Sequence, residues 1–312
     1  MGAKSRVALC LFGQMRTYKE TYDFLYENVI EEFDPDIFIH TWKEVGGTWK
    51  ESGSINSGEV SEDELEQLYS PESVVIEEFQ QEYYEKLGDV EVPEKVKRLD
   101  TFKKGAIPMF YKTYKVNELK REAEIERGST YDIVILVRPD LIILEKLTAE
   151  IVENTDIFWC GPKTGNPYLL HDQYLISNSK NMDYYASIWK KLNEYWETEL
   201  HGKYKKMGEP CGEFDIDGVN IGRPTRLIHY HFETSDIPVK EHDLRAKIIR
   251  HGTDTRYFKQ GKLGKIKHIY NNGGSDIRWS TGPLLSGLII LREDGLGKLY
   301  RRSKEYISER LS

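Results

Sequence analysis

The chain has 312 residues and a formal net charge of −8 at pH 7. Its length exceeds that of a typical single domain, so we expect one large α/β unit with an appendage, or two closely packed subdomains. The negative charge argues against a generic nucleic-acid binder, which is usually basic. The longest late apolar stretch, 284–291, is too short to span a bilayer, and three widely spaced cysteines are typical of reduced thiols in a cytoplasmic protein.

The first half of the chain alternates between strand and helix patterns. Apolar spacing and turn residues predict, in chain order, a strand at 6–12, a helix at 21–33, a strand at 36–40, a loop at 43–60, a helix at 61–69 and a strand at 74–79. Ser61 and Glu64 have the spacing of a capping box, which favours a helix beginning there. The charged segment 80–104 is weakly patterned and expected to be peripheral.

The second half continues this alternation around one strongly apolar strand. The patterns predict a helix at 109–127, strands at 131–138, 156–161 and 174–178, helices at 181–199 and 224–234, and a strand at 237–239. The run of Ile, Val and Leu before Arg138 is typical of a strand buried on both faces of a parallel sheet. We therefore predict a nucleotide-binding α/β domain at 1–243 with a mostly parallel central sheet flanked by helices, and a helical C-terminal extension at 244–312.

Charged residues follow the most apolar strand directly. Arg138, Pro139 and Asp140 end the run at its carboxyl end, where open α/β sheets bind ligands. Asp140 is therefore a candidate metal or substrate ligand. The alternative is an ion pair between Asp140 and Arg138 that only ends the strand.

Two other strand ends supply polar or aromatic residues to the same edge. Gly13 allows close approach of a ligand to the backbone, and Gln14 and Arg16 follow it; the alternative is an ordinary solvated turn. His40 and Trp42 come at the end of the second strand, where the Trp ring stacks on a base or sugar or covers the core.

Five motifs occur in one order: FGQMRTY, DIFIHTW, FYKTYKVNELK, DIVILVRPDL and HDQYLISNSKNMDYY. In this the chain resembles GT-A-fold glycosyltransferase-like proteins of bacterial polysaccharide loci and large DNA viruses, over roughly residues 5–240. The resemblance implies a GT-A-like, Rossmann-like fold. It implies that Gln14 and Arg16 border the nucleotide and that the helix of Lys115 approaches the pyrophosphate. It also implies that Asp140 takes the place of the metal-binding aspartate and that Asp172 faces the acceptor.

One feature of the resemblance is incomplete. The usual metal motif has two aspartates around one residue, whereas Arg138 takes the first position here. A bound Mn²⁺ or Mg²⁺ is expected to depend on Asp140 alone, with phosphate oxygens and water as its other ligands. The literal pattern at Asp215 and Asp217 is followed by a glycine and favours a surface turn, and His229 and His231 are spaced unfavourably for shared ligation.

The expected function is transfer of a sugar from a nucleotide diphosphate sugar to a glycan hydroxyl. Arg16, Lys115 and Arg138 supply positive charge for the pyrophosphate, and Asp172 is the candidate catalytic base or acceptor ligand. The expected location is the cytoplasm, or the host cytoplasm if the chain is viral. Two alternatives remain, namely a non-catalytic nucleotide- or glycan-binding module and a nucleotidyltransferase.

Overall fold

The computed structural model describes residues 5–46, 58–80, 83, 86–87, 90–91, 106–161, 170–197, 224–242 and 244–249. The chain divides into two compact units, Met1–Thr253 and Asp254–Ser312, and every described residue belongs to the first. Beyond Ile249, the predicted C-terminal extension lies outside the described residues. No helix within the described ranges is long and apolar enough to cross a membrane.

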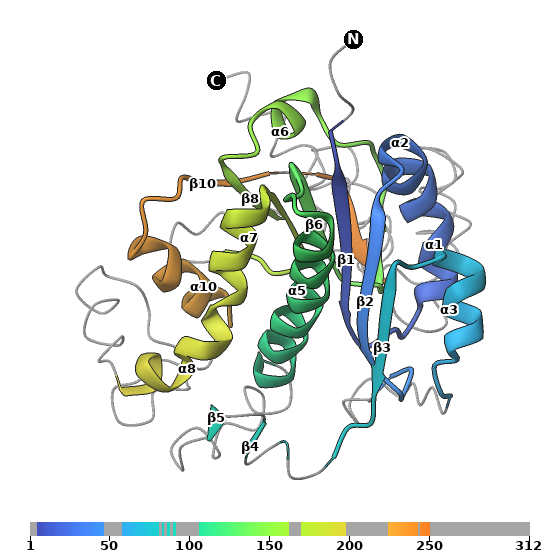
Figure 1. Cartoon of the computed structure of the whole chain (residues 1–312), viewed down its shortest axis with the longest axis horizontal. Coiled ribbons are helices and arrows are strands. Elements are labelled where there is room, and N and C mark those ends of the chain that lie inside the picture. Colours follow the sequence, from blue (N-terminus) through green and yellow to red (C-terminus); the bar gives the residue numbers. More distant parts are fainter. Residues whose placement is uncertain are drawn as a thin grey trace, which may run out of the picture. The chain divides into compact units, whose positions relative to one another are not determined.

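A seven-stranded sheet organises the first unit (Figure 1), in the order β10-β8-β9-β6-β1-β2-β3. Its strands are β1 (Val7–Gly13), β2 (Asp36–Trp42), β3 (Ser73–Glu77), β6 (Ile133–Val137), β8 (Phe158–Gly161), β9 (Tyr174–Ser177) and β10 (Val239–Glu241). Only β9 runs antiparallel to its neighbours in this sheet. The predicted α/β class with a mostly parallel sheet is confirmed, and the arrangement is compatible with a Rossmann-like fold.

Alternate strand residues pack into two helical layers, because successive side chains point to opposite faces of a sheet. Ala8 and Cys10 of β1 belong to the core under α5 (Ile107–Arg127), α7 (Ser179–Ala186), α8 (Ile188–Glu197) and α10 (Pro224–Glu233). Leu9 and Leu11 belong to the core under α1 (Tyr18–Leu25) and α3 (Glu62–Tyr69). Figure 1 shows these two groups of helices on opposite sides of β1 and β2. Burial on both faces explains why β1 and β6 are nearly continuous apolar runs.

The long helix α5 agrees closely with its prediction. Pro108 lies in its first turn, where the missing N–H leaves no bond unmade. Gly128 ends the helix in a left-handed conformation, with φ of 67°, and its N–H bonds to the Ile125 carbonyl at 3.2 Å. This ending directs the chain into β6.

Two predicted helices are divided in the structure. The pattern at 21–33 is α1, which begins at Tyr18, followed by a π-helical turn η1 (Tyr26–Ile30) and α2 (Glu31–Phe33). The pattern at 181–199 is α7 and α8, which are separated at Ser187. Helix α7 begins before Asn181 because Asn178 caps it, with its Oδ1 accepting from the Asn181 N–H at 2.9 Å.

The predicted capping box is wrong. Ser61 is the N-cap residue of α3, but its side chain makes no capping hydrogen bond. Glu64 instead accepts from the Tyr18 hydroxyl and the Lys19 ammonium, both at 2.7 Å. Glu64 therefore bonds to side chains of α1 and not to the backbone N–H of Ser61, as a capping box would require.

Four short strands and a short helix were not predicted: β4 (Lys86–Leu87), β5 (Val90–Glu91), β7 (Leu141–Ile143), β11 (Ala246–Ile248) and α6 (Ala149–Glu153). Strands β7 and β11 pair antiparallel with each other over about a hundred intervening residues, which no local pattern reveals.

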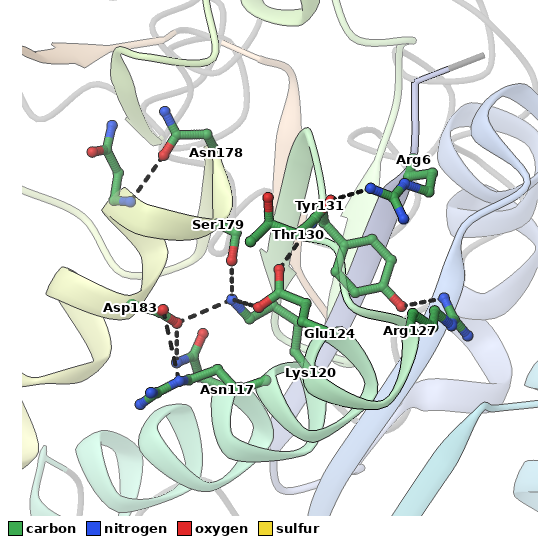
Figure 2. A network of polar contacts seen from close by, with 12 residues as sticks. Arg6, Asn117, Lys120, Glu124, Arg127, Thr130, Tyr131, Asn178, Ser179 and Asp183 are labelled. Carbon is green, nitrogen blue, oxygen red and sulfur yellow. Dashed lines mark hydrogen bonds and ion pairs between the residues drawn. The ribbon is translucent and has the colours of Figure 1, made fainter. Parts of the chain in front are cut away.

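A buried polar network joins α5 to the start of α7 at the amino ends of the parallel strands (Figure 2). The fully buried Lys120 ammonium bonds to Ser179 and forms ion pairs with Glu124 at 3.1 Å and Asp183 at 3.0 Å. Asn117 donates to the same Asp183 carboxylate at 2.8 Å. Because each partner of Lys120 is anionic or a hydroxyl, this buried charge is paired as burial requires.

Candidate functional site

The predicted site residues at the ends of β1, β2, β6 and β9 lie at the carboxyl edge of the central sheet. Strand β1 is flanked by β2 and β6, both parallel to it, so Gly13, Trp42 and Val137 end at one edge. Strand β9 starts at the same edge, where Tyr174 pairs with Val137. Asp172, two residues before Tyr174, therefore lies in the loop next to Arg138, as expected for loops that surround one ligand site.

The loop after β1 has an unusual backbone. Gly13 has φ of 91° and Arg16 has φ of 40°, both in the left-handed region. For a non-glycine residue this region costs roughly 1–2 kcal/mol. Arg16 is held there by its N–H, which donates to the Val45 carbonyl, and Gly13 accepts from the Thr41 hydroxyl at 2.7 Å. The loop thus has a fixed, strained conformation of a kind that occurs at binding sites.

Two arginines converge on the Asp140 carboxylate, whose side chain is only 1% exposed. Arg138 donates through Nε to Oδ1 and through Nη2 to Oδ2, both at 2.9 Å. Arg16 donates through Nη1 to Oδ2 at 2.8 Å. The ion pair between Arg138 and Asp140, left open by the sequence, is present, and Arg16 joins it from a loop more than a hundred residues away.

The arginine side chains keep a route to solvent. Arg16 is 24% exposed and Arg138 is 21% exposed, while the carboxylate between them is covered. Burial lowers the pKa of Arg138, but the charges of Asp140 and then Asp172 outweigh it and hold that pKa above its usual value. Two guanidinium groups around one carboxylate carry one excess positive charge, which the nearby Asp172 carboxylate offsets. The guanidinium N–H donors still suit phosphate oxygens, because they make charge-assisted hydrogen bonds.

Asp172 is the carboxylate that this cluster leaves unbonded. It is half-buried, and its side chain makes no hydrogen bond or ion pair with the described residues. Its charge acts on Arg138 and, after the effect of burial, also raises the pKa of the buried Tyr185 phenol. Gln14 is also half-buried with no side-chain hydrogen bond to the described residues.

His40 and Trp42 lie inside β2 and not beyond it, which corrects the predicted end of that strand. Both side chains are buried in the layer under α5. The Trp42 ring stacks on Tyr111, with centroids 6.0 Å apart and an interplanar angle of 18°. Of the two alternatives for Trp42, this burial favours a ring that covers the core.

The sequence missed a buried lysine at this edge. Lys112 is fully buried, and its ammonium lies 3.3 Å from the Trp42 ring centroid and 2.9 Å from both the Thr41 carbonyl and the Glu77 carboxylate. Lys115, which was predicted to approach the pyrophosphate, pairs with Glu118 at 2.7 Å on the helix surface. The sequence does not predict this burial, because lysines on helices are usually solvated. The one sequence feature consistent with it is that Lys112 lies four residues before the buried Val116, on the same side of α5.

Lys112 is expected to make stability depend on pH. Burial lowers the pKa of Lys112 to about 7, although the nearby Glu77 carboxylate acts in the opposite direction. The ordinary value is 10.5, so between pH 7 and 10 the unfolded chain binds more protons and the parent protein gains stability as pH rises. The Lys112→Met variant should lack this gain, which is on the order of 1 kcal/mol per pH unit. Urea titrations of both proteins at pH 7, 8 and 9 measure it, and parallel pH profiles would contradict the assignment.

The possible metal-ligating side chains in the described residues do not fit the expected Mn²⁺ or Mg²⁺. Both Asp140 oxygens already accept from arginines, so a cation would have to displace one of them. In the described part of the chain, no three His, Cys, Asp or Glu side chains lie together as a metal site. Asp215 and Asp217 lie outside the described residues, whereas His231 is buried and bonded to the Tyr184 carbonyl at 2.7 Å.

Comparison with known proteins assigns no family. Neither a protein-family model nor a curated protein sequence matches the chain. The resemblance to GT-A-fold glycosyltransferases therefore rests on its motifs.

Proposed function

We propose that the protein is a glycosyltransferase that moves a sugar from a nucleotide diphosphate sugar to a glycan hydroxyl, on a GT-A-like fold. The observation that carries this proposal is the convergence of Arg16 and Arg138 at the carboxyl edge of a Rossmann-like sheet. The half-buried Asp172 beside them supports a reaction there, because it is a carboxylate without a bonded partner among the described residues.

The arginines suit a pyrophosphate leaving group. Sugar transfer requires that the negative charge developing on the diphosphate is stabilised by preorganised donors. Asp140 fixes one face of each guanidinium and occupies only Nη1 of Arg16, so other N–H groups remain for phosphate oxygens. Since the described donors do not fit a divalent cation, we assign charge neutralisation to these two side chains.

Asp172 suits the acceptor. A carboxylate that accepts the acceptor hydroxyl's proton assists an inverting transfer, whereas one that only holds the acceptor fits a retaining transfer. Either role needs a carboxylate that is not already paired. Asp172 meets this condition among the described residues, and Asp140 does not.

A binding module without catalysis is the second candidate, and the saturated Asp140 favours it. A protein that has lost its metal motif keeps the sheet and the arginines and binds a nucleotide or glycan without turnover. A nucleotidyltransferase on a related sheet is the third. Reaction products separate all three, because the glycosyltransferase releases nucleoside diphosphate, the nucleotidyltransferase releases pyrophosphate, and the module releases neither.

The Arg16→Ala variant tests the proposal directly. It should bind nucleoside diphosphates more weakly by roughly 1–3 kcal/mol, because a charge-assisted contact is lost. Calorimetry on parent and variant, with and without EDTA, gives the affinities, and chelation should leave both unchanged. Arg121→Ala is a matched control, since Arg121 is 53% exposed and lies near Asp183 at the opposite edge. Unchanged affinity in a folded Arg16→Ala protein would show that Arg16 does not contact the nucleotide. Loss of affinity on addition of EDTA would show that a divalent cation takes part in binding.

A further inference from the structure

A short segment near residue 250 contacts two loops of the candidate site and the strand that follows the third. We call residues 244–249 the strap. Its strand β11 pairs antiparallel with β7, which follows Asp140 directly, through Ala246 with Ile143 and Ile248 with Leu141. The Leu144 N–H donates to the Arg245 carbonyl at 2.8 Å, and Arg245 pairs with Glu145 at 2.7 Å. This pairing holds the strap against the site.

The end of the strap joins the first and second loops. The Ile249 N–H donates to the Asp140 carbonyl at 2.7 Å, and the Ile249 carbonyl accepts from the Thr17 hydroxyl at 3.0 Å. Both Thr17 and Ile249 are about 99% buried. One strap residue therefore bridges the backbone of Asp140 and the residue that follows Arg16.

The start of the strap contacts β9, which follows the third loop. The Tyr174 hydroxyl donates to the His242 carbonyl at 2.7 Å and accepts from the Leu244 N–H at 3.1 Å. Tyr174 begins β9 two residues after Asp172, and its hydroxyl fills the space beside Gly161 that a Cβ there would occupy. The position of the Asp172 loop is thus linked to the same segment.

Thr17 departs from the usual role of its position. It is the N-cap residue of α1, where a Thr hydroxyl normally accepts from a backbone N–H of the first turn. Here its side chain makes no such capping bond and donates to the strap. The neighbouring Arg16 has a left-handed backbone, which persists only when surrounding contacts enforce it.

We propose that Thr17 is a positioning residue, which through its bond to the strap holds Arg16 in the conformation that reaches Asp140 and the ligand's phosphates. The inference rests on the proposed nucleotide-binding function for its first test and has a second test that does not. In this arrangement the strap acts on Arg16 through Thr17 and on Asp140 through its backbone carbonyl.

A double-mutant cycle tests the inference. Thr17→Val keeps the side-chain shape and removes the hydroxyl, and it should lower the affinity for nucleoside diphosphate about threefold to tenfold, the range for one neutral hydrogen bond. Thr17→Ser should restore most of the affinity because it keeps the donor. In an Arg16→Ala background, Thr17→Val should change the affinity little, because residues that act through one another are not additive.

Two results of the cycle would overturn the inference. One is parental affinity in a folded Thr17→Val protein. The other is an equal loss in the parent and in the Arg16→Ala background, since this would mean that Thr17 does not act through Arg16.

The second test uses hydrogen exchange and needs no ligand. Thr17→Val should speed exchange of the Ile249 and Arg16 amides, while the Leu144 amide, bonded to Arg245 in the β7–β11 region, keeps its parental rate. If the parent binds no nucleotide, the proposed function fails and this measurement alone decides the positioning role. Unchanged exchange at both Ile249 and Arg16 would overturn that role.

Discussion

Replacing Asp172 by asparagine is expected to lower sugar transfer by about a hundredfold or more, the usual size of general-base assistance. Asparagine has nearly the same shape but cannot take the acceptor's proton. Since Asp172 makes no hydrogen bond within the described residues, the substitution breaks no bond among them and should spare the fold. Nucleotide affinity should not fall, because Arg16 and Arg138 are intact and the change removes a negative charge beside Arg138. Initial rates and calorimetry on the same preparation measure the two effects.

Asp132→Asn provides the control for Asp172. Asp132 precedes β6 at the opposite edge of the sheet and accepts from the exposed Arg6 N–H at 2.9 Å. This control loses the same charge away from the site and should transfer at the parental rate. An Asp172→Asn protein that also transfers at that rate would show a structural carboxylate. Weaker donor binding in Asp172→Asn would place Asp172 near the pyrophosphate instead of the acceptor.

Replacing Asp140 by alanine is expected to lower the free energy of unfolding by about 3 kcal/mol. Removing one partner of a buried ion pair typically costs 3–5 kcal/mol because it leaves charge uncompensated, and the partial exposure of the two arginines places this case at the lower end. Urea denaturation of parent and variant measures the loss. The Asp140→Ala, Arg138→Met double variant should recover part of it, because one of the unpaired cations is gone.

The result for Asp140 also separates the two roles considered for it. A carboxylate that mainly orients arginines contributes to stability in the absence of any ligand or cation. One that mainly holds a metal is a stability cost in the free protein, because its charge is not compensated until the cation binds. Parental or increased stability in Asp140→Ala, together with EDTA-sensitive nucleotide binding in the parent, would therefore reinstate the metal site.

The sequence by itself determined the class of the fold and the edge at which polar residues gather. Apolar runs in β1 and β6 are visible because strands buried on both faces have no polar positions, and α5 is visible because Pro108 and Gly128 mark its ends. The order of these elements placed Arg16, Arg138 and Asp172 at strand ends. That information is local, so it can be read along the chain.

Only the tertiary structure decided which of these side chains contact each other and which are buried. Arg16 and Asp140 are 124 residues apart, and only the pairing of β1 with β6 brings the arginine onto the carboxylate. The burial of Lys112 beside Glu77 and Trp42 follows from helix packing, which a solvated-lysine pattern does not reveal.

The same reason applies to the strap. Its link from Ile249 to Thr17 spans 232 residues. Local propensity predicts strands and helices, whereas contacts of this separation depend on how the packed elements close on one another. The sequence therefore indicated candidate side chains, and the packing decided that Asp140 pairs with Arg16 and Arg138, while Asp172 stays unbonded among the described residues.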